Sequence, residues 1–475
     1  MRFLDLGVIL AYLIAVTWFG ARFRHGQKSL KDYFLGGRNA PWWAISLSIV
    51  SAETSTLTIV GTPGLSFAGN FGFLQIVFGY LLARIVISLL FLPQYFRGQM
   101  FTAYELMQRR FGSRIRKVTA ATFLVTRALA EGVRVFAISI VISIILGTGE
   151  VASIILIVCL TLFYTFEGGM TAVIWTDVVQ MTMYVLGAIL SFWVILSKIP
   201  GGWPHVYDVA QSTGKLQVFN FGFDWHQPYT IWAGVLGGCF LTTASHGTDQ
   251  LIVQRLLSAK TERQSRAALF ASWGVIFFQF VLFLLVGVSL FVYYGDAHLA
   301  APKPLDRLYP QFIWENLPVG IAGLVTAAIL AAAMANLSAA LNSLASTTVM
   351  DFYRPLAGKL DDARLLGYAR VATVAWGVVL VLIGVVASHW GSVLESGLSI
   401  ASVTLGMLLG VFLLGVLTKR VGEKAAVAGV LAGLAAILYV KFQTRIAYTW
   451  WVMIGSMATF SVGLLSSYLI KGQNS

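Results

Sequence analysis

Charge is scarce in this chain: only 11% of its 475 residues are charged, against roughly 25% in soluble globular proteins. Cysteine is scarcer still. Cys159 and Cys239 both fall inside apolar segments, which excludes a disulfide framework or a cysteine metal motif. Walker A, HExxH and nucleophile-elbow patterns are also missing, so an ATP-driven or catalytic role has no support and we expect no enzyme.

Apolar residues are abundant instead: they make up 58% of the chain, and the mean hydropathy is +0.80. Stretches of about 20 apolar residues recur from end to end, which is the length that spans a bilayer. An outer-membrane barrel would show short alternating segments. The sequence therefore predicts an all-α polytopic membrane protein with about 13 spans: 4–22, 41–67, 71–95, 118–147, 151–167, 171–197, 229–251, 267–294, 318–350, 371–389, 391–418, 424–442 and 447–469.

The net charge of +13 indicates which loops face the cytoplasm rather than a nucleic-acid-binding surface. Lys and Arg gather in alternate loops, within 22–38, 97–117, 255–266, 354–370 and 419–424. Cytoplasmic loops carry this excess of basic residues. We expect a multi-pass protein of the plasma membrane, and of a bacterial inner membrane in particular, with its N-terminus outside and its C-terminus in the cytoplasm. No cleavable signal peptide is expected, since the first apolar segment runs into a basic loop.

Glu53 stands in the middle of an apolar segment, PWWAISLSIVSAETSTLTIVGTPGLSF. A charge at membrane depth costs several kcal/mol unless it is paired, hydrated or neutralised. Hydroxyl residues surround it between Ser51 and Thr58, and Gly61, Pro63 and Gly64 follow. Unwound backbone is tolerated at that depth only where it lines a cavity. The segment predicts a broken helix at a binding site in a protein that moves a solute across the membrane.

A second interruption is predicted five spans later. The segment 229–251 carries three glycines and then the polar run TTASHGTDQ. Paired interrupted helices in corresponding positions are typical of inverted-repeat transporters. The long loops 198–228 and 295–317 are rich in Pro, Gly, Trp and Tyr, and we expect short interfacial helices there.

The fourth span carries Arg127, Glu131 and Arg134. Spacings of four and three place all three on one helix face. An ionic ladder facing the bundle interior is one interpretation. The other is that Arg134 binds a ligand or pairs with Glu53, because charges at this depth need a partner.

Several segments resemble the sodium/solute symporter family: SAETSTLTIVGTPG (51–64), TAYELMQRRFG (102–112), TAVIWTDVVQ (171–180), TDQLIVQRLLSAK (248–260) and GLVTAAILAAAMANLSAALNSLASTTVMDFY (323–353). The resemblance covers nearly the whole chain. It implies one transporter domain with the LeuT-type fold. Spans 41–197 and 229–418 would be inverted five-helix repeats, with one extra helix at 4–22 and two at 424–469.

The same resemblance implies sodium as the coupling ion, at one or two sites. One site would use backbone oxygens of Ser51, Thr54 and Ala332 with the side chains at 335 and 336. The family usually has two hydroxyls at those last positions, and this chain has Ala335 and Asn336. Hard cations bind carbonyl, hydroxyl and carboxylate oxygens, so Ala335 removes one ligand, which Asn336 or Glu53 would replace. A second site would use Asp177 and Ser338.

For the solute, the resemblance gives mixed indications. Arg134 matches an arginine that binds the carboxylate in sialic-acid members, an acidic residue at Glu53 resembles the proline branch, and TDQLIVQR resembles the sugar branch. Asp249, Gln250 and Arg255 are expected at the inner gate or the cytoplasmic rim, in a structural role. The predicted solute-binding residues are Glu53, Ser55, Thr58, Gln75, Phe78, Arg134 and His246.

These observations predict sodium-coupled symport of a small polar solute into the cell by alternating access. A sugar or polyol is favoured. The alternatives are an amino acid, a sugar acid or another carboxylate, and a proton-coupled or ion-independent carrier. A transporter-like sensor would need an appended domain, for which the residues after the last span are too few. We expect a monomer or weak homo-oligomer, with the solute and the lipid bilayer as partners and no nucleic acid.

Overall fold

A computed structural model describes residues 2–21, 38–97, 103–164, 170–353 and 362–469. The described chain is helical, without a β-strand. Its first half contains α1 (Phe3–Ala21), α3 (Trp42–Glu53), α4 (Thr56–Ala68), η3 (Phe71–Phe73), α5 (Leu74–Leu90), α6 (Leu92–Phe96), α7 (Ala103–Phe111), α8 (Ser113–Leu146), α9 (Glu150–Tyr164), α10 (Met170–Lys198) and α11 (Gly202–Ser212).

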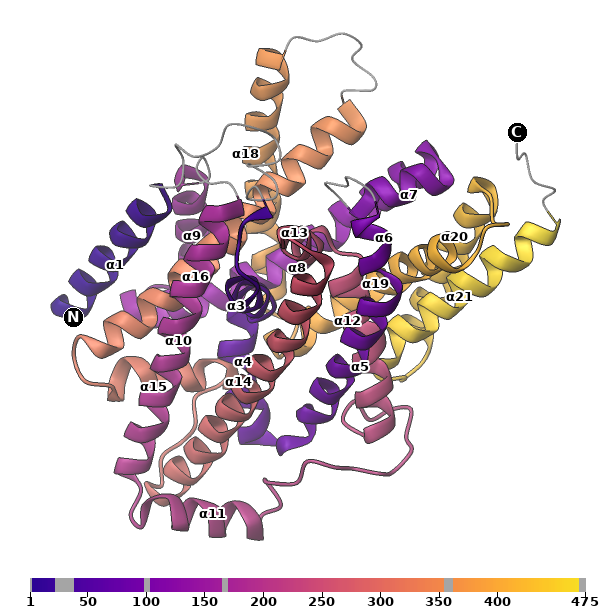
Figure 1. Cartoon of the computed structure of the whole chain (residues 1–475). Helices are drawn as coiled ribbons and strands as arrows, with labels where there is room; N and C mark the ends of the chain where they lie inside the picture. Colours follow the sequence, from indigo (N-terminus) through magenta and orange to yellow (C-terminus); the bar gives the residue numbers. More distant parts are fainter. Residues whose placement is uncertain (1, 22–37, 98–102, 165–169, 354–361, 470–475) are drawn as a thin grey trace.

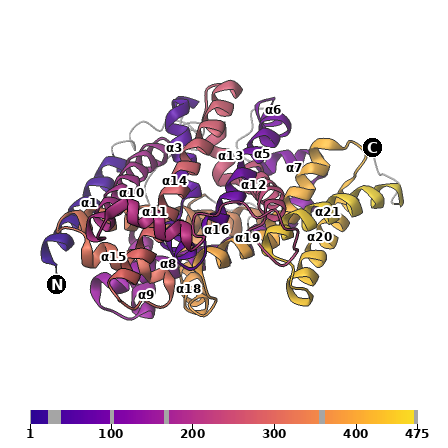
Figure 2. The ribbon, with the colours of Figure 1, turned by 90° about the horizontal axis from the view of Figure 1, so that it is seen from below.

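The second half contains η4 (Trp232–Leu236), α12 (Gly237–Gly247), α13 (Gln250–Leu257), α14 (Glu262–Asp296), η5 (Leu305–Arg307), α15 (Leu308–Asn316), α16 (Ile321–Thr347), η6 (Thr348–Tyr353), α18 (Asp362–Ala387), α19 (Val393–Leu417), α20 (Glu423–Gln443) and α21 (Tyr448–Leu469). The short helices α11 and α15 fall in the two long loops, as predicted from the sequence. In Figures 1 and 2, α1 and the α20–α21 pair lie at opposite ends of the bundle.

Each of the thirteen predicted spans coincides with a helical segment. Within the described ranges, nine helices are long and apolar enough to cross a membrane, and one bent helix pair passes the same test together. Two shorter apolar helices, Phe3–Val16 and Glu150–Leu162, match the first and fifth predicted spans. The seventh corresponds to η4 and α12. Most of the basic loop residues at 22–38 and 354–370 lie outside the described residues.

The predicted break in the second span is confirmed. Helix α3 ends at Glu53, α4 begins at Thr56, and the two axes differ by 65°. The amide of Thr54 still bonds to the carbonyl of Val50, but the amide of Ser55 bonds to the carbonyl of Glu53. The helical pattern would have used Ser51 as that acceptor. The break therefore releases the Ser51 carbonyl at membrane depth.

The glycines after the break have a different role from the one predicted. Helix α4 continues through Gly61, Pro63 and Gly64. A Cβ at Gly61 would lie 2.8 Å from Cβ of Leu394, and one at Gly64 would lie 3.2 Å from the carbonyl oxygen of Leu305. These glycines therefore let the start of α19 and the η5 turn pack closely against α4.

The second interruption is also present, between α12 and α13. The break falls at Thr248–Asp249, and the Asp249 carboxylate accepts a hydrogen bond from the amide of Leu251 at 2.8 Å, which caps α13. The glycines of this span do not unwind it into a loop. A Cβ at Gly238 would lie 2.4 Å from the carbonyl oxygen of Ile76, so this glycine allows α12 and α5 to pack together.

Candidate functional site

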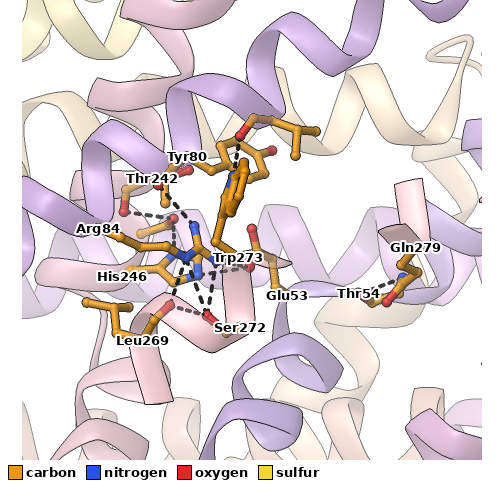
Figure 3. A network of polar contacts seen from close by, with 12 residues as sticks. Glu53, Thr54, Tyr80, Arg84, Thr242, His246, Leu269, Ser272, Trp273 and Gln279 are labelled. Atoms are coloured by element: carbon orange, nitrogen blue, oxygen red, sulfur yellow. Dashed lines mark hydrogen bonds and ion pairs between the residues drawn. The ribbon is translucent and has the colours of Figure 1, made fainter. Parts of the chain in front are cut away.

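Glu53, the last residue of α3, is held by two side chains from other helices (Figure 3). Its Oε2 accepts a hydrogen bond from Nη2 of Arg84 at 2.9 Å and lies 3.1 Å from Nε2 of His246. Arg84 comes from α5 and His246 from α12. The end of the broken helix is thus tied to two neighbouring helices by a buried charged group.

Arg84 is fully buried and makes further hydrogen bonds to α14. Its Nε donates to the carbonyl of Leu269 at 3.1 Å and lies 3.3 Å from Oγ of Ser272. Its Nη1 donates to the carbonyl of Tyr80 at 3.2 Å. A buried charge needs both a counter-charge and satisfied donors. The surrounding backbone and Glu53 provide both.

The predicted pairing of Glu53 with Arg134 is therefore wrong, because Arg84 and His246 occupy the Glu53 carboxylate. Arg84 was missed in the sequence. The signal was present, since LLARIVISLL places one arginine in an otherwise apolar span. Such an arginine must find a partner at membrane depth.

The predicted ionic ladder on α8 is present. Nη2 of Arg127 lies 3.0 Å from Oε1 of Glu131, and Nη1 of Arg134 bonds to the same oxygen. One carboxylate thus serves two guanidinium groups, and the charge of Asp249 also acts on Arg127. The Glu131 side chain is 1% exposed, whereas Arg134 keeps 27% of its side-chain surface exposed.

A small pocket connects this ladder to the broken helix. It has a volume of about 10 Å³, which is room for about one water molecule. Three helices and the break contribute its walls: Ser55, Thr56, Glu131, Arg134, Val135, Ile138, Ala333, Asn336 and Leu337. The pocket unites the predicted residues Ser55, Arg134 and Asn336, and a solute can enter only when these helices move apart.

The other five predicted solute residues, Glu53 among them, lie outside this pocket lining. Both ends of the Gln75 amide are used by backbone groups: Nε2 donates to the carbonyls of Gly72 and Tyr229, and Oε1 accepts from the amide of Asn220. The Phe78 ring stacks on Phe219 with ring centroids 5.8 Å apart. Thr58 is buried within α4, and His246 is bound to Glu53.

A second buried ion pair joins α10, α13 and α3. Nη2 of Arg255 lies 2.9 Å from Oδ2 of Asp177, and Ser48 donates to that same oxygen at 2.5 Å. The Nε of Arg255 donates to Oγ of Ser48 at 2.9 Å. The sequence predicts separate roles for Asp177 and Arg255, whereas the structure joins the two side chains by a direct contact.

The residues predicted to bind sodium are distributed around the break. Ser51 and Thr54 are buried at the end of α3. On α16, Ala332 is buried, and Ala335, Asn336 and Ser338 are partly buried. Among these four, Asn336 lines the pocket with Ser55. Ala335 carries no side-chain oxygen, so any ion here must draw a ligand from elsewhere.

This arrangement defines a class of protein. A bundle of apolar helices, one of them broken at membrane depth beside buried charges and released backbone carbonyls, is the architecture of a membrane transporter. A solved structure of a Na⁺-coupled sialic acid symporter, in a substrate-bound outward-open state, matches with a TM-score of 0.86 at 27% identity over 98% of both chains. Mhp1, a nucleobase-cation-symport-1 family transporter, matches with a TM-score of 0.56 over 92% of this chain and 93% of that one, at 12% identity. The fold is of the LeuT type.

The model of the sodium:solute symporter family matches residues 33–433, and the chain belongs to this family. The human sodium/iodide cotransporter is 30% identical over 92% of this chain and 69% of its own length. The sodium-coupled monocarboxylate transporter 2 of Bos taurus is 28% identical over 90% of this chain and 68% of its own length. The protein is accordingly a multi-pass, sodium-coupled symporter of a small-molecule solute.

Proposed function

We propose that the solute is a small carboxylated compound of the sugar-acid class, rather than the sugar or polyol favoured by the sequence. The observation that carries this proposal is Arg134. Its guanidinium lines the pocket beside Ser55, and it shares Glu131 with Arg127. The Arg134 side chain keeps 27% of its surface exposed although it is paired with Glu131, and a guanidinium is well suited to bind a carboxylate through two hydrogen bonds.

The related proteins support the same class. Three of them are named for anionic solutes: sialic acid, iodide and monocarboxylates. A neutral sugar would offer the Arg134 guanidinium no carboxylate to bind. A zwitterionic amino acid has less support, because the carboxylate expected to bind its amine, Glu53, is already bonded to Arg84 and His246.

Transport would use the two interrupted helices, α3–α4 and α12–α13. Sodium and solute would bind at the break, and rocking of the surrounding helices would expose the site to one face of the membrane and then to the other. The pocket and the ion pairs are built from residues of one chain. The expected direction is into the cell, with the basic loops on the cytoplasmic side.

Uptake into proteoliposomes tests the solute class. Carboxylates such as sialic acid, neutral sugars and proline are compared with and without a sodium gradient. Arg134→Gln should weaken the affinity for carboxylate about 10- to 150-fold, since a hydrogen bond to a charged group contributes about 1.5–3 kcal/mol. Arg127→Gln is the matched control: it removes the same charge from the same ladder, at a residue that does not line the pocket.

Two outcomes would overturn the proposal. One is sodium-driven uptake of a neutral sugar with no response to carboxylates. The other is an equal loss of carboxylate affinity in Arg134→Gln and Arg127→Gln, because that would assign Arg134 to the ladder alone. Uptake that follows an inward proton gradient and ignores sodium would favour proton coupling.

A further inference from the structure

The end of α3 turns two hydroxyl side chains toward α10 and α14, the helices packed against it. Ser51 and Thr54 are 4% and 1% exposed. Nε2 of Gln279, from α14, donates to Oγ1 of Thr54 at 2.7 Å. Figure 3 shows this contact on the side of the break away from Arg84 and His246. Polar groups gathered inside an apolar bundle need partners, because water is excluded there.

Two oxygens of this cluster have no hydrogen-bond partner. They are Oε1 of Gln279 and the hydroxyl oxygen of Tyr184 on α10, and both side chains are 2% exposed. The Tyr184 hydroxyl lies near the side chains of Thr54 and Ser51 but forms no hydrogen bond of normal geometry with them. Buried polar atoms are nearly always satisfied in native proteins, so an unpartnered pair at one place indicates a missing ion or water.

The neighbouring charge favours a cation over a water molecule. Asp177 interacts with Tyr184, and its Oδ2 takes the bonds from Arg255 and Ser48. Its Oδ1 has only a long contact, 3.5 Å, with Oγ of Ser51. The cluster therefore combines a carboxylate oxygen, an amide oxygen and hydroxyl oxygens, which are the ligand types that hard cations select.

We propose that Tyr184 and Gln279 are sodium ligands, in a site completed by Ser51, Thr54 and Asp177. This site uses α10 and α14 on one side of the break, whereas the site expected from the family resemblance uses α16. The inference goes beyond the solute assignment and does not depend on it, because the ion site is tested without any solute.

The experiment measures the melting temperature of the purified protein against sodium chloride, with choline chloride holding the ionic strength constant and no solute present. Tyr184→Phe and Gln279→Met each remove the proposed oxygen with little change in size. Each should raise the half-saturating sodium concentration about tenfold, which corresponds to about 1.4 kcal/mol. Tyr12→Phe is the matched control: the Tyr12 hydroxyl is also buried without a partner, but it lies on α1.

Gln279→Glu separates ligand loss from misfolding. The glutamate keeps an oxygen at the same position, so Gln279→Glu should have the half-saturating sodium concentration of the wild type. Gln279→Met should show the tenfold increase given above. The proposal fails if Tyr184→Phe and Gln279→Met both shift the half-saturating sodium by less than about twofold, since the cluster then holds only water. It also fails if sodium alone does not stabilise the wild type, or if Tyr12→Phe shifts the response as much as Tyr184→Phe.

Discussion

Glu53, at the end of α3, forms a buried ion pair with Arg84 of α5, and Nη2 of Arg84 lies 2.9 Å from Oε2 of Glu53. The Arg84 side chain is fully buried, and that of Glu53 is 12% exposed. The pair fixes the end of α3 against α5, directly beside the break at Thr54 and Ser55. The intact ion pair is therefore needed to hold the residues of the break in place.

Glu53→Gln leaves the Arg84 charge buried without its counter-charge. Removing one member of a buried pair typically costs about 3–5 kcal/mol, so the melting temperature in detergent should fall markedly. The double variant Glu53→Gln/Arg84→Gln should recover much of the loss, because it removes the orphaned charge. Glu53→Gln/Arg134→Gln is the control and should recover nothing. Recovery with Arg134 instead of Arg84 would contradict the observed pairing.

Asp177 can bind sodium or serve only as the structural partner of Arg255, and uptake assays distinguish these two roles. If its carboxylate binds sodium, Asp177→Asn should raise the sodium concentration for half-maximal uptake more than it weakens solute binding at saturating sodium. Arg255→Gln breaks the same ion pair but leaves the carboxylate in place, so its effect on the sodium requirement should be smaller. Equal effects of the two variants would reduce Asp177 to a structural partner of Arg255.

The turn η5 carries a pH-sensitive carboxyl. Asp306 is buried, and its Oδ2 accepts a hydrogen bond from the amide of Val393 at the start of α19. Burial raises the pKa of this carboxyl to about 6, the Val393 amide opposes the rise, and the charge of Glu395 adds to it. Between its ordinary pKa of 3.8 and about 6, the folded state binds more protons than the unfolded chain.

Stability should therefore fall as the pH rises through that window. A shift of roughly two units corresponds to about 3 kcal/mol. Asp306→Asn cannot ionise, so the difference in melting temperature between the wild type and Asp306→Asn should change between pH 4 and pH 7, with the wild type losing more. A constant difference across this range would show that Asp306 does not titrate there.

Membrane orientation is testable by labelling single cysteines in a Cys159→Ser/Cys239→Ser background. Ser212→Cys, at the exposed end of α11, should react with an impermeant maleimide added outside intact cells. Lys419→Cys, in an exposed basic loop, should react only after permeabilisation. Lys215 is a poor probe, because it is buried and its Nζ donates to the carbonyls of Phe67 and Gly69. The reverse labelling pattern would invert the topology inferred from the basic loops.

The sequence by itself determined the membrane class, the thirteen helical segments and the break beside Glu53. These depend on local composition: an apolar run must span the bilayer as a helix, and a polar interruption at that depth must line a cavity. The ladder of Arg127, Glu131 and Arg134 also followed from helical spacing alone. The family motifs added the coupling ion.

Only the tertiary structure decided which charges meet. Glu53 pairs with Arg84, 31 residues away, and with His246, 193 residues away. Asp177 pairs with Arg255, and Gln279 reaches Thr54 across 225 residues. Hydropathy and helical spacing predict that a buried carboxylate needs a positively charged partner, but they do not distinguish among the arginines of the other helices. The packing of α3 against α14, and of α5 against both α12 and α14, selects the partner, because ion pairs and hydrogen bonds form only between groups that the fold brings within about 3 Å.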